Sequence, residues 1–580
     1  MKQPFNRRQW QTLPSSLNHL HPLVARLVHS RGIDTPDALD FSLRGLIPFT
    51  TMKGIETAVA LLATALAEQQ RILIVGDYDA DGATSTAVAI RALRLLGARQ
   101  VSYLVPNRVR YGYGLSPELV ALALQQQPDL LVTVDNGIAS VAGVAAARQQ
   151  GVRVIITDHH LPGGRLPQAD AIVNPNQPGC PFPTKALAGV GVIFYLMLAL
   201  RSHLREQGWF SAAAVAEPNL ASLLDLVALG TIADLVPLDH NNRILVQQGL
   251  LRIRAGQCVA GITALLDVAK REAAHLVSDD LAYAIAPRLN AAGRIDEMAR
   301  GIETLLCDNP LEALTLAQQL DELNRERQGI ESEMRQDAEA IVAAMTFEDA
   351  DALPLGLTLY NPEWHEGVIG IVASRIKEQT QRPVVVLTDA TAEGEMAMVK
   401  GSARSITALH LRDTLAAIDV ASPDLMTRFG GHAMAAGLTL PKANLPQFQS
   451  AFAAAVAAQL HASDLVSRRL SDGPLQDVTV TPRLVDELLK ILPWGQQLEA
   501  PLFDDIFTVV EHRWLKEQHL KMALRWQNSG DQVEAIFFNA VSQGKPPPLH
   551  GALHILYRLG VNRWRGQESV QILVQAINPA

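Results

Sequence analysis

Cysteine is almost absent from this sequence of 580 residues. Only Cys180, Cys258 and Cys307 occur, and their spacing fits neither a zinc-binding motif nor a disulfide framework. Such scarcity is typical of proteins from a reducing compartment. We therefore expect a cytoplasmic protein.

The sequence also lacks an apolar segment of membrane length. The longest uncharged apolar run covers residues 186–200, between Lys185 and Arg201. It is shorter than the ~20 residues that a membrane helix needs, so we predict a buried core helix there. The basic residues near the N-terminus, Arg7 and Arg8, have no apolar segment behind them, and we expect neither a signal peptide nor contact with a membrane.

Positive charge is not in excess. Lys and Arg number 50 against 59 Asp and Glu, which gives a formal charge of −9 and excludes a polybasic nucleic-acid coat. If the protein binds a polyanion, local basic clusters or metal ions must do the binding. Hydrophobic residues make up 48% and charged residues 19%, a globular composition, and the length suggests about three to five domains.

Short apolar runs alternate with helical patterns between about residue 71 and residue 175. This alternation predicts βαβ units and a parallel sheet. The expected strands cover residues 71–75, 101–105, 130–134, 152–156 and 171–173, and the expected helices cover residues 84–96, 116–126 and 140–150. The next stretch, to about residue 300, has mostly helical patterning.

A long amphipathic helix is predicted for residues 311–345, which contain no proline and a single glycine. We interpret it as a strut between domains. The β/α alternation then resumes, with expected strands at 355–360 and 383–387 around a helix at 367–379. The fold class is therefore α/β, in two parts.

The remaining residues, from about 465, change character. Five short strand-like segments with polar turns predict a small β-barrel, at residues 507–510, 523–526, 533–538, 552–557 and 570–574. Four of the seven tryptophans lie in this region: Trp494, Trp514, Trp526 and Trp564. They could stack on nucleobases, but core packing explains most buried tryptophans equally well.

Acidic residues follow three of the predicted parallel strands. The first strand runs into Asp77, Asp79 and Asp81, the second into Asp135, and the third into Asp158-His159-His160. The carboxyl ends of parallel strands meet at one edge of the sheet, so these side chains should converge. Such a cluster repels itself unless cations neutralise it, and its ligand types suit Mn²⁺ or Mg²⁺. A solvated acidic turn is the alternative for any one strand end.

A further carboxylate, Asp234, ends an otherwise apolar stretch with the sequence Gly-Thr-Ile-Ala-Asp at residues 230–234. On pattern alone it fits a helix cap or a surface residue as well as a metal ligand.

Taken together, these motifs resemble the DHH phosphoesterase superfamily. The resemblance rests on residues 76–82, 158–160 and 230–234, and other motifs resemble its bacterial RecJ branch: residues 106–108, 112–115, 286–294, 364–370, 401–405 and 430–437. It spans essentially the whole chain. It implies a DHH domain with an N-terminal extension (1–310), a connecting helix (311–345), a DHHA1 domain (346–464) and an OB-like single-strand-binding barrel (465–580).

The resemblance also implies an activity, that of a single-strand-specific 5′→3′ DNA exonuclease. It would use two divalent ions, Mg²⁺ or Mn²⁺, to hydrolyse phosphodiester bonds and release 5′-mononucleotides. By position, Asp77, Asp79 and Asp135 would hold one ion. Asp81, Asp135, His159 and Asp234 would hold the second. His160 would contact the scissile phosphate, and Asp158 would orient a ligand.

Several further residues are expected to bind the strand. Ser402 and Arg404, in a glycine-started turn, together with Arg108, would grip the 5′-terminal phosphate through a guanidinium fork and backbone amides. The remaining expected contacts are Arg288 and Asn290 at the scissile phosphate, and Gly431 and His432. For each, a purely structural arginine or histidine is the alternative.

The sequence contains no G-x-x-x-x-G-K-[ST] loop, so the chain is not itself a helicase motor. The resemblance suggests a monomer that acts in recombination and mismatch repair, beside single-strand-binding protein and a helicase of the RecQ type. Two alternatives stay open: a small-nucleotide phosphodiesterase of the same superfamily, and an inactive DNA-binding scaffold of a replication complex. The chain length and barrel argue against the first, and the intact acidic positions against the second.

Overall fold

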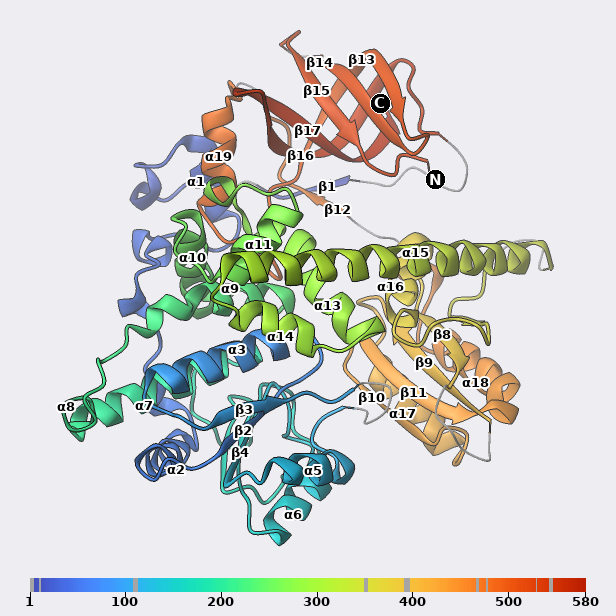
Figure 1. Ribbon diagram of the computed structural model, residues 1–580. Helices are drawn as coiled ribbons and strands as arrows, with labels where there is room; N and C mark the ends of the chain where they lie inside the picture. Colours follow the sequence, from blue (N-terminus) through green and yellow to red (C-terminus); the bar gives the residue numbers. More distant parts are fainter. Residues whose placement is uncertain are drawn as a thin grey trace.

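The computed structural model describes residues 5–9, 12–107, 113–348, 353–390, 397–465, 469–475, 478–527, 529–541 and 546–580. Figure 1 shows a first α/β domain, a long helix that leaves it, a second α/β domain at the far end of that helix, and a barrel above the first domain. Where the described parts cover it, the fold class expected from the sequence is confirmed.

The first domain is built on a five-stranded parallel sheet with the order β3-β2-β4-β5-β6. Its strands are β2 (Ile72–Val75), β3 (Val101–Leu104), β4 (Leu130–Val134), β5 (Arg153–Thr157) and β6 (Ala171–Val173). The central strands are short, rich in β-branched residues and almost wholly buried, which is typical of a parallel sheet covered on both faces. The strands expected from the sequence are confirmed to within a residue or two.

Alternate residues of these strands belong to two different cores, because successive side chains point to opposite faces. Ile74 and Val132 pack with the large core, whereas Leu73 and Leu131 pack with a smaller one. The helices over the two faces are α2 (Ile55–Ala67), α3 (Ala80–Leu95) and α7 (Gly189–Glu206) on one side, and α5 (Pro117–Ala123) and α6 (Val141–Gln149) on the other.

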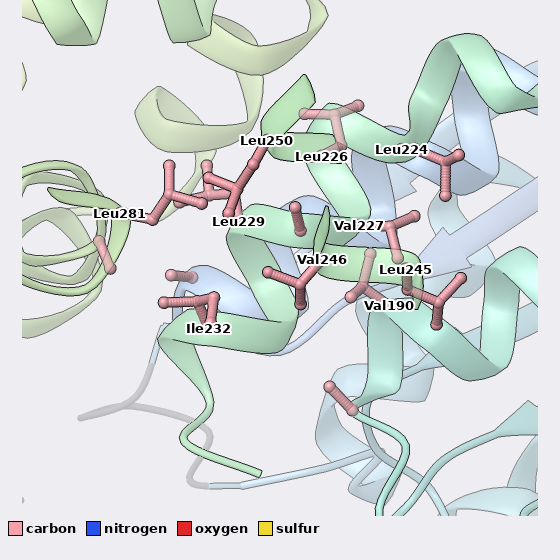
Figure 2. Packing of buried hydrophobic residues seen from close by; sticks show 14 of the residues in the cluster. Val190, Leu224, Leu226, Val227, Leu229, Ile232, Leu245, Val246, Leu250 and Leu281 are labelled. Carbon is pink, nitrogen blue, oxygen red and sulfur yellow. The ribbon is translucent and has the colours of Figure 1, made fainter. Parts of the chain in front are cut away.

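The rest of the first domain is helical. Its helices are α1 (Pro22–His29), α8 (Trp209–Ala212), α9 (Leu224–Ala233), α10 (His240–Arg254), α11 (Ala260–Val268), α12 (Ser278–Asp280), α13 (Ala286–Ile295) and α14 (Ala299–Leu306). Every residue of α9 from Leu224 to Ile232 is buried, as expected for a helix that is apolar on all sides. Figure 2 shows its side chains packed among Leu245, Val246 and Val190.

Helix α15 (Pro310–Glu348) joins the two α/β domains. Its 39 residues span about 58 Å at 1.5 Å per residue. Ala313 and Leu320 pack into the core of the first domain, and Met334 and Ala338 pack into a core of the second. The predicted strut is confirmed, and each end is anchored in a different core.

The second α/β domain contains a mixed five-stranded sheet with the order β10-β11-β9-β8-β7. Its strands are β7 (Leu357–Tyr360), β8 (Val384–Asp389), β9 (Met398–Arg404), β10 (Arg428–Gly431) and β11 (Ala435–Pro441), and its helices are α16 (Ile369–Thr380), α17 (Leu411–Ala421) and α18 (Leu445–Ala457). In this sheet, the only parallel pairing is the one between β7 and β8 across the strands that the structure describes.

One prediction is wrong here, because the segment Gly401–Arg404 is not a turn. It forms the end of β9, which pairs with β8 on one side and β11 on the other. Its backbone amides and carbonyls belong to these two ladders, so they cannot form an anion-binding turn. A ligand at this segment would therefore be contacted through side chains, such as those of Ser402 and Arg404, and not through a backbone turn.

The C-terminal region forms a closed five-stranded barrel, as expected, with the order β13-β14-β15-β17-β16. Its strands are β13 (Phe503–Leu515), β14 (His519–Trp526), β15 (Gln532–Phe537), β16 (Ala552–Trp564) and β17 (Gln567–Pro579), preceded by α19 (Pro482–Lys490). Trp494 is buried and Trp526 packs against Phe507, whereas the Trp514 and Trp564 side chains are 37% and 68% exposed. Base stacking stays a prediction for the two exposed rings.

A short parallel pair of strands, unexpected from the sequence, joins the N-terminal segment to the segment that precedes the barrel. β1 (Phe5–Arg7) pairs with β12 (Arg469–Ser471) beneath the barrel (Figure 1). Among the described residues no single helix is long and apolar enough to cross a membrane. One helix pair bent by 90°, Leu43–Thr51 with Ile55–Ala67, has the length and composition of a membrane span, and these two properties are the whole of the evidence for one.

Candidate active site

The acidic residues that follow β2, β4 and β5 meet at one edge of the first sheet, because these strands are direct neighbours. Asp77, Asp79 and Asp135 each offer one ligand atom, and the three atoms lie within 4.8 Å of one another. Asp79 caps the N-terminus of α3 by accepting hydrogen bonds from the amides of Asp81 and Gly82 through Oδ1. Its position is thus fixed by the start of that helix.

A second group consists of Asp81, His159 and Asp234, whose ligand atoms also lie within 4.8 Å of one another. Asp81 lies in the first turn of α3, and Asp234 ends the buried helix α9. The two carboxylate oxygens of Asp81 accept hydrogen bonds from the amides of Gly189 (2.6 Å) and Val190 (2.9 Å) at the start of α7. Ligand atoms of Asp135, His159 and His160 are equally close to one another.

The carboxylates of this cluster repel one another. Burial and the charge of Asp234 raise the pKa of Asp81 to about 7, and burial and the charge of Asp79 raise the pKa of Asp234 to about 7. Burial and four neighbouring aspartates raise the pKa of Asp135 well above its usual value. A buried arrangement of this kind is costly unless cations occupy it.

The imidazole of His159 is well suited to bind a cation. Burial and the neighbouring charge of His160 lower its pKa, so that it is neutral at physiological pH and keeps a lone pair. Its Nε2 lies 3.1 Å from Asp135 Oδ1, yet neither buried atom has a hydrogen-bond partner among the described residues. This donor set of carboxylate oxygens and one imidazole fits Mn²⁺ or Mg²⁺.

Asp158 and His160 form a separate pair beside the cluster. The fully buried Asp158 accepts hydrogen bonds from the amides of Ile138, His159 and His160, and from His160 Nδ1 at 2.7 Å. Although burial opposes it, the hydrogen bond from His160 holds the pKa of Asp158 below its usual range. Burial opposes the charged form of His160 as well, but Asp158 raises the pKa of His160 to about 9. His160 is therefore a cation at neutral pH.

Tyr113 is a neighbour of this pair that the sequence reasoning did not single out. Its hydroxyl donates to the carbonyl of Asp135 at 3.2 Å and lies 3.1 Å from His160 Nδ1. It belongs to the Gly-Tyr-Gly motif at residues 112–114, and that motif is the sequence feature that could have indicated it.

Helix α13 contributes Arg288 and Asn290. Asn290 Oδ1 accepts a hydrogen bond from the amide of Ala80, beside Asp79, and therefore connects α13 to the start of α3. Arg288 forms an ion pair with Asp321 of α15 at 2.7 Å and donates to the carbonyl of Ala284. These partners give Arg288 a structural function, and a contact with phosphate stays a prediction.

The second domain faces the Asp158–His160 pair, beside the cluster, across a cleft of about 540 Å³. Asp158, His160 and Tyr113 line one wall, and Gly431 and His432 line the other. Burial and the positive charges of His160 and Arg412 lower the pKa of His432. Arg404 Nη1 donates to Ser402 Oγ at 3.1 Å on β9. Arg108 lies outside the described residues.

Two further arginines of the second domain, Arg412 and Arg428, line the same cleft and were not anticipated from the sequence. Both are exposed, and no ion pair of either is found within the described ranges. Arg428 stands two residues before the Gly-Gly-His motif, but a single exposed arginine gives no signal of its own in a sequence. The tertiary arrangement alone places it opposite His160.

Comparison with known proteins gives consistent matches along the chain. Family models match at residues 71–231 (DHH family, N-terminal domain), 353–458 (DHHA1 domain) and 471–576 (RecJ OB domain). The single-stranded-DNA-specific exonuclease RecJ of Dickeya dadantii is 50% identical over 98% of this chain and 97% of its own length. The protein of the same name from Haemophilus influenzae is 46% identical over the full length of both.

Solved structures agree with these matches. The crystal structure of Thermus thermophilus RecJ in complex with Mn²⁺ has a TM-score of 0.77 at 31% identity, and it covers 99% of this chain and 80% of its own. The corresponding Mg²⁺ complex has a TM-score of 0.71 at 30% identity, covering 99% of this chain and 78% of its own.

Proposed function

This chain belongs to the RecJ family of single-stranded-DNA-specific exonucleases, and we propose that it removes 5′-mononucleotides one at a time from the 5′ end of a single strand. The exonuclease activity on single-stranded DNA follows from identity of about 50% over nearly the whole chain. The polarity, the product and the roles of individual residues are parts of the proposal.

The observation that carries the proposal is the pair of adjacent ligand groups. Asp77, Asp79 and Asp135 would hold one divalent ion. Asp81, Asp135, His159 and Asp234 would hold the second, with Asp135 shared. The clustering of these side chains and the Mn²⁺ and Mg²⁺ found in related structures support this assignment. When bound, two such ions supply a nucleophile at neutral pH and stabilise the charge that develops on the scissile phosphate.

The chain's own residues would then position the strand and stabilise the charge on the scissile phosphate. His160, protonated through its bond to Asp158, would face the scissile phosphate as proton donor or charge stabiliser. Asp158 would hold the imidazole in that orientation. Asn290 and Arg288, on the helix that reaches Ala80, would lie along the same phosphate.

Recognition of the 5′ end is assigned to the second domain, assisted by Arg108 of the first. Ser402 and Arg404, with Arg108, would bind the terminal phosphate through side chains, and Gly431 and His432 would contact the substrate across the cleft. A terminus bound at a fixed distance from the metal ions explains why one nucleotide would be released per cut.

The wider proposals concern domains and partners. We propose the domain limits 1–310, 311–345, 346–464 and 465–580, with the barrel guiding single strands. The protein would act as a cytoplasmic monomer in recombination and mismatch repair. Since it has no motor motif, a helicase of the RecQ type and single-strand-binding protein would present the strand.

An end-labelled single strand tests the proposal. With Mn²⁺ or Mg²⁺, a 5′ label should be released at once as a mononucleotide, whereas a 3′ label should remain on progressively shorter strands. A chelator should stop both reactions, and a circular single strand should stay intact. Early release of the 3′ label would contradict the polarity, and cleavage of the circle would contradict exonuclease action.

A further inference from the structure

The edge strand β6 carries no acidic residue to the proposed metal site. β2, β4 and β5 each run into aspartates at their carboxyl ends, whereas β6 runs into Asn174-Pro175-Asn176. We call these three residues the Asn-Pro-Asn segment. Because β6 pairs in parallel with β5, the segment leaves the sheet at the same edge as the two histidines that come after β5. It therefore lies beside part of the proposed metal site.

The two asparagines of this segment bind the main chain of both histidines. Asn176 Nδ2 donates a hydrogen bond to the carbonyl of His159 at 2.6 Å. Asn174 Nδ2 donates one to the carbonyl of His160 at 3.0 Å. Asn174 Oδ1 also accepts a hydrogen bond from the amide of Asn176 at 2.7 Å, and the Asn174 side chain is wholly buried. The bonds thus form a continuous connection from the end of β6 to the loop after β5.

His159 depends on these bonds more than a metal-binding histidine usually does. Such an imidazole is ordinarily oriented by a hydrogen bond at its second ring nitrogen. His159 Nε2 is directed at Asp135 and Asp234, and within the described ranges no hydrogen bond is found at His159 Nδ1. The residue is fixed through its main chain instead. Asp158 accepts a hydrogen bond from its amide at 2.7 Å, and Asn176 binds its carbonyl.

Only a hydrogen-bond donor is compatible with the place that the Asn176 side chain occupies. Asn176 Nδ2 faces two carbonyl oxygens, those of His159 at 2.6 Å and Lys185 at 3.3 Å, and a carbonyl can only accept. The segment itself is held in place, because Lys185 Nζ donates a hydrogen bond to the carbonyl of Pro175 at 2.6 Å. Asn176 therefore binds the histidine loop from a well-supported position.

We propose that Asn176, supported by Asn174, is a positioning residue of the metal site. It fixes the main chain of His159 so that the imidazole stays directed at Asp81 and Asp234. Neither asparagine belongs to the groups of ligand atoms, so the contribution of Asn176 passes through His159. Outer partners of this kind typically contribute about 10–100-fold to metal affinity. The inference rests on the proposed metal assignment and adds the residue that orients its single imidazole.

The test removes the carboxamide and measures metal binding directly. In a calorimetric titration of the metal-free protein with Mn²⁺, Asn176→Ala should weaken at least one binding step about 10-fold or more. At saturating Mn²⁺, its kcat and KM for a single strand should stay within about twofold of the wild-type values. Asn444→Ala is the matched control, because Asn444 Nδ2 also donates to two backbone carbonyls, those of Asp424 and Leu425, in the second domain. It should leave Mn²⁺ binding unchanged.

Two further variants complete the test. Asn176→Leu is close to asparagine in size and has no donor, so it serves in place of Asn176→Ala if that chain fails to fold. In a His159→Ala background, Asn176→Ala should change Mn²⁺ affinity no further, because its effect passes through the imidazole. Equal Mn²⁺ affinity of the wild type and the Asn176 variants would overturn the proposal, as would an undiminished effect without His159. If the wild type itself bound no Mn²⁺, the proposed metal assignment would be wrong instead.

Discussion

Asp135 is both deeply buried and held in an unusual backbone conformation. It is 2% exposed, follows β4 directly and has a φ of 62°, in the left-handed region. Asn and Asp enter this region more readily than other non-glycine residues. An alanine at position 135 would therefore mix backbone strain with the loss of a ligand, whereas asparagine keeps the backbone preference and removes only the charge.

We predict that Asp135→Asn lowers kcat at least ~10³-fold, about 4 kcal/mol, because it removes the carboxylate shared by both proposed ions. The melting temperature of the metal-free protein should not fall, since one of several mutually repelling carboxylates is gone. Kinetics at saturating Mn²⁺ and a thermal scan in chelator are the two measurements. Cleavage near the wild-type rate by this variant would refute the shared ligand.

Arg404 decides, on our proposal, which end of the strand is recognised. Because β9 commits its backbone to two ladders, recognition depends on side chains, and loss of the guanidinium has no backbone substitute. Arg404→Ala should weaken binding of 5′-phosphorylated strands by about 1.5–3 kcal/mol, the range for a hydrogen bond to a charged group. Strands with a 5′-hydroxyl should be affected much less.

The measurement is kcat/KM for both ends, on wild type and variant, as a double cycle. Equal slowing of both substrates would assign the polarity to another group in the cleft. Lys442→Ala is a suitable control, because this lysine forms its ion pair with Asp389 at 2.6 Å and lies outside the proposed contacts.

At the scale of elements, a buried carboxylate helps to connect the strand pair β1–β12 to the barrel. Asp504 of β13 accepts hydrogen bonds from Arg7 of β1 and Ser471 of β12, and His554 Nε2 of β16 lies 2.6 Å away. Burial opposes its ionisation, but the hydrogen bonds from Arg7, Ser471 and His554 hold the pKa of Asp504 below its usual value. The ionised form is thus favoured in the folded protein.

This direction fixes a pH dependence of stability. A carboxyl whose pKa is lowered on folding stabilises the protein above its unfolded pKa, about 3.9, and the stabilisation disappears as the pH falls through the lower folded value. Asp504→Asn should therefore cost about 1–2 kcal/mol at pH 7, discounted for the half-exposed Arg7. The difference from wild type should be constant above pH ~5 and shrink below pH ~4.

Thermal or denaturant unfolding of both proteins across this pH range is the measurement. A difference that persists unchanged at about pH 3, or that grows as the pH falls, would show that ionisation of Asp504 is not what connects these strands.

At the scale of the whole molecule, the segment that leads into the barrel packs against the first domain. Trp494, in the segment before the barrel, is buried, its ring lies 5.1 Å from the Arg31 guanidinium, and its carbonyl accepts a hydrogen bond from Ser278 Oγ. A cut at residue 464 would remove this contact as well as β12. A cut after Leu502 keeps this contact and β12. It removes the barrel strands, together with Asp504 and its bonds to Arg7 and Ser471, and it retains all proposed metal ligands.

We predict that the chain ending at Leu502 still cleaves single strands at high enzyme concentration. Its affinity for long strands should fall, and the slope of log affinity against log salt should become shallower by about 0.7 for each phosphate that the barrel no longer binds. A trinucleotide, which on this proposal is bound by the two α/β domains, should bind equally to both chains. Unchanged affinity for long strands would place the strand-binding surface elsewhere.

The sequence by itself determined those elements that depend on residues close to one another along the chain. Apolar runs of strand length, helical periodicity and turn residues define β2, β4, β5, α15 and the barrel strands, because these patterns arise from local backbone geometry. The strand ends then placed Asp77, Asp135 and His159 at one edge of a sheet. Asp234 is different, since its apolar helix gave no local sign of metal binding and only the family resemblance indicated it.

Only the tertiary structure decided which distant surfaces meet. The pairing of β1 with β12 joins residues 5–7 to residues 469–471, which are far apart in the sequence, and no local pattern encodes it. Gly401–Arg404 has few strand-forming residues and looks like a turn, yet two flanking strands impose an extended backbone on it. The ion pair between Arg288 and Asp321 joins two helices that pack together, and Arg428 lines the same cleft as His160 because two domains meet there. Both arrangements depend on tertiary packing.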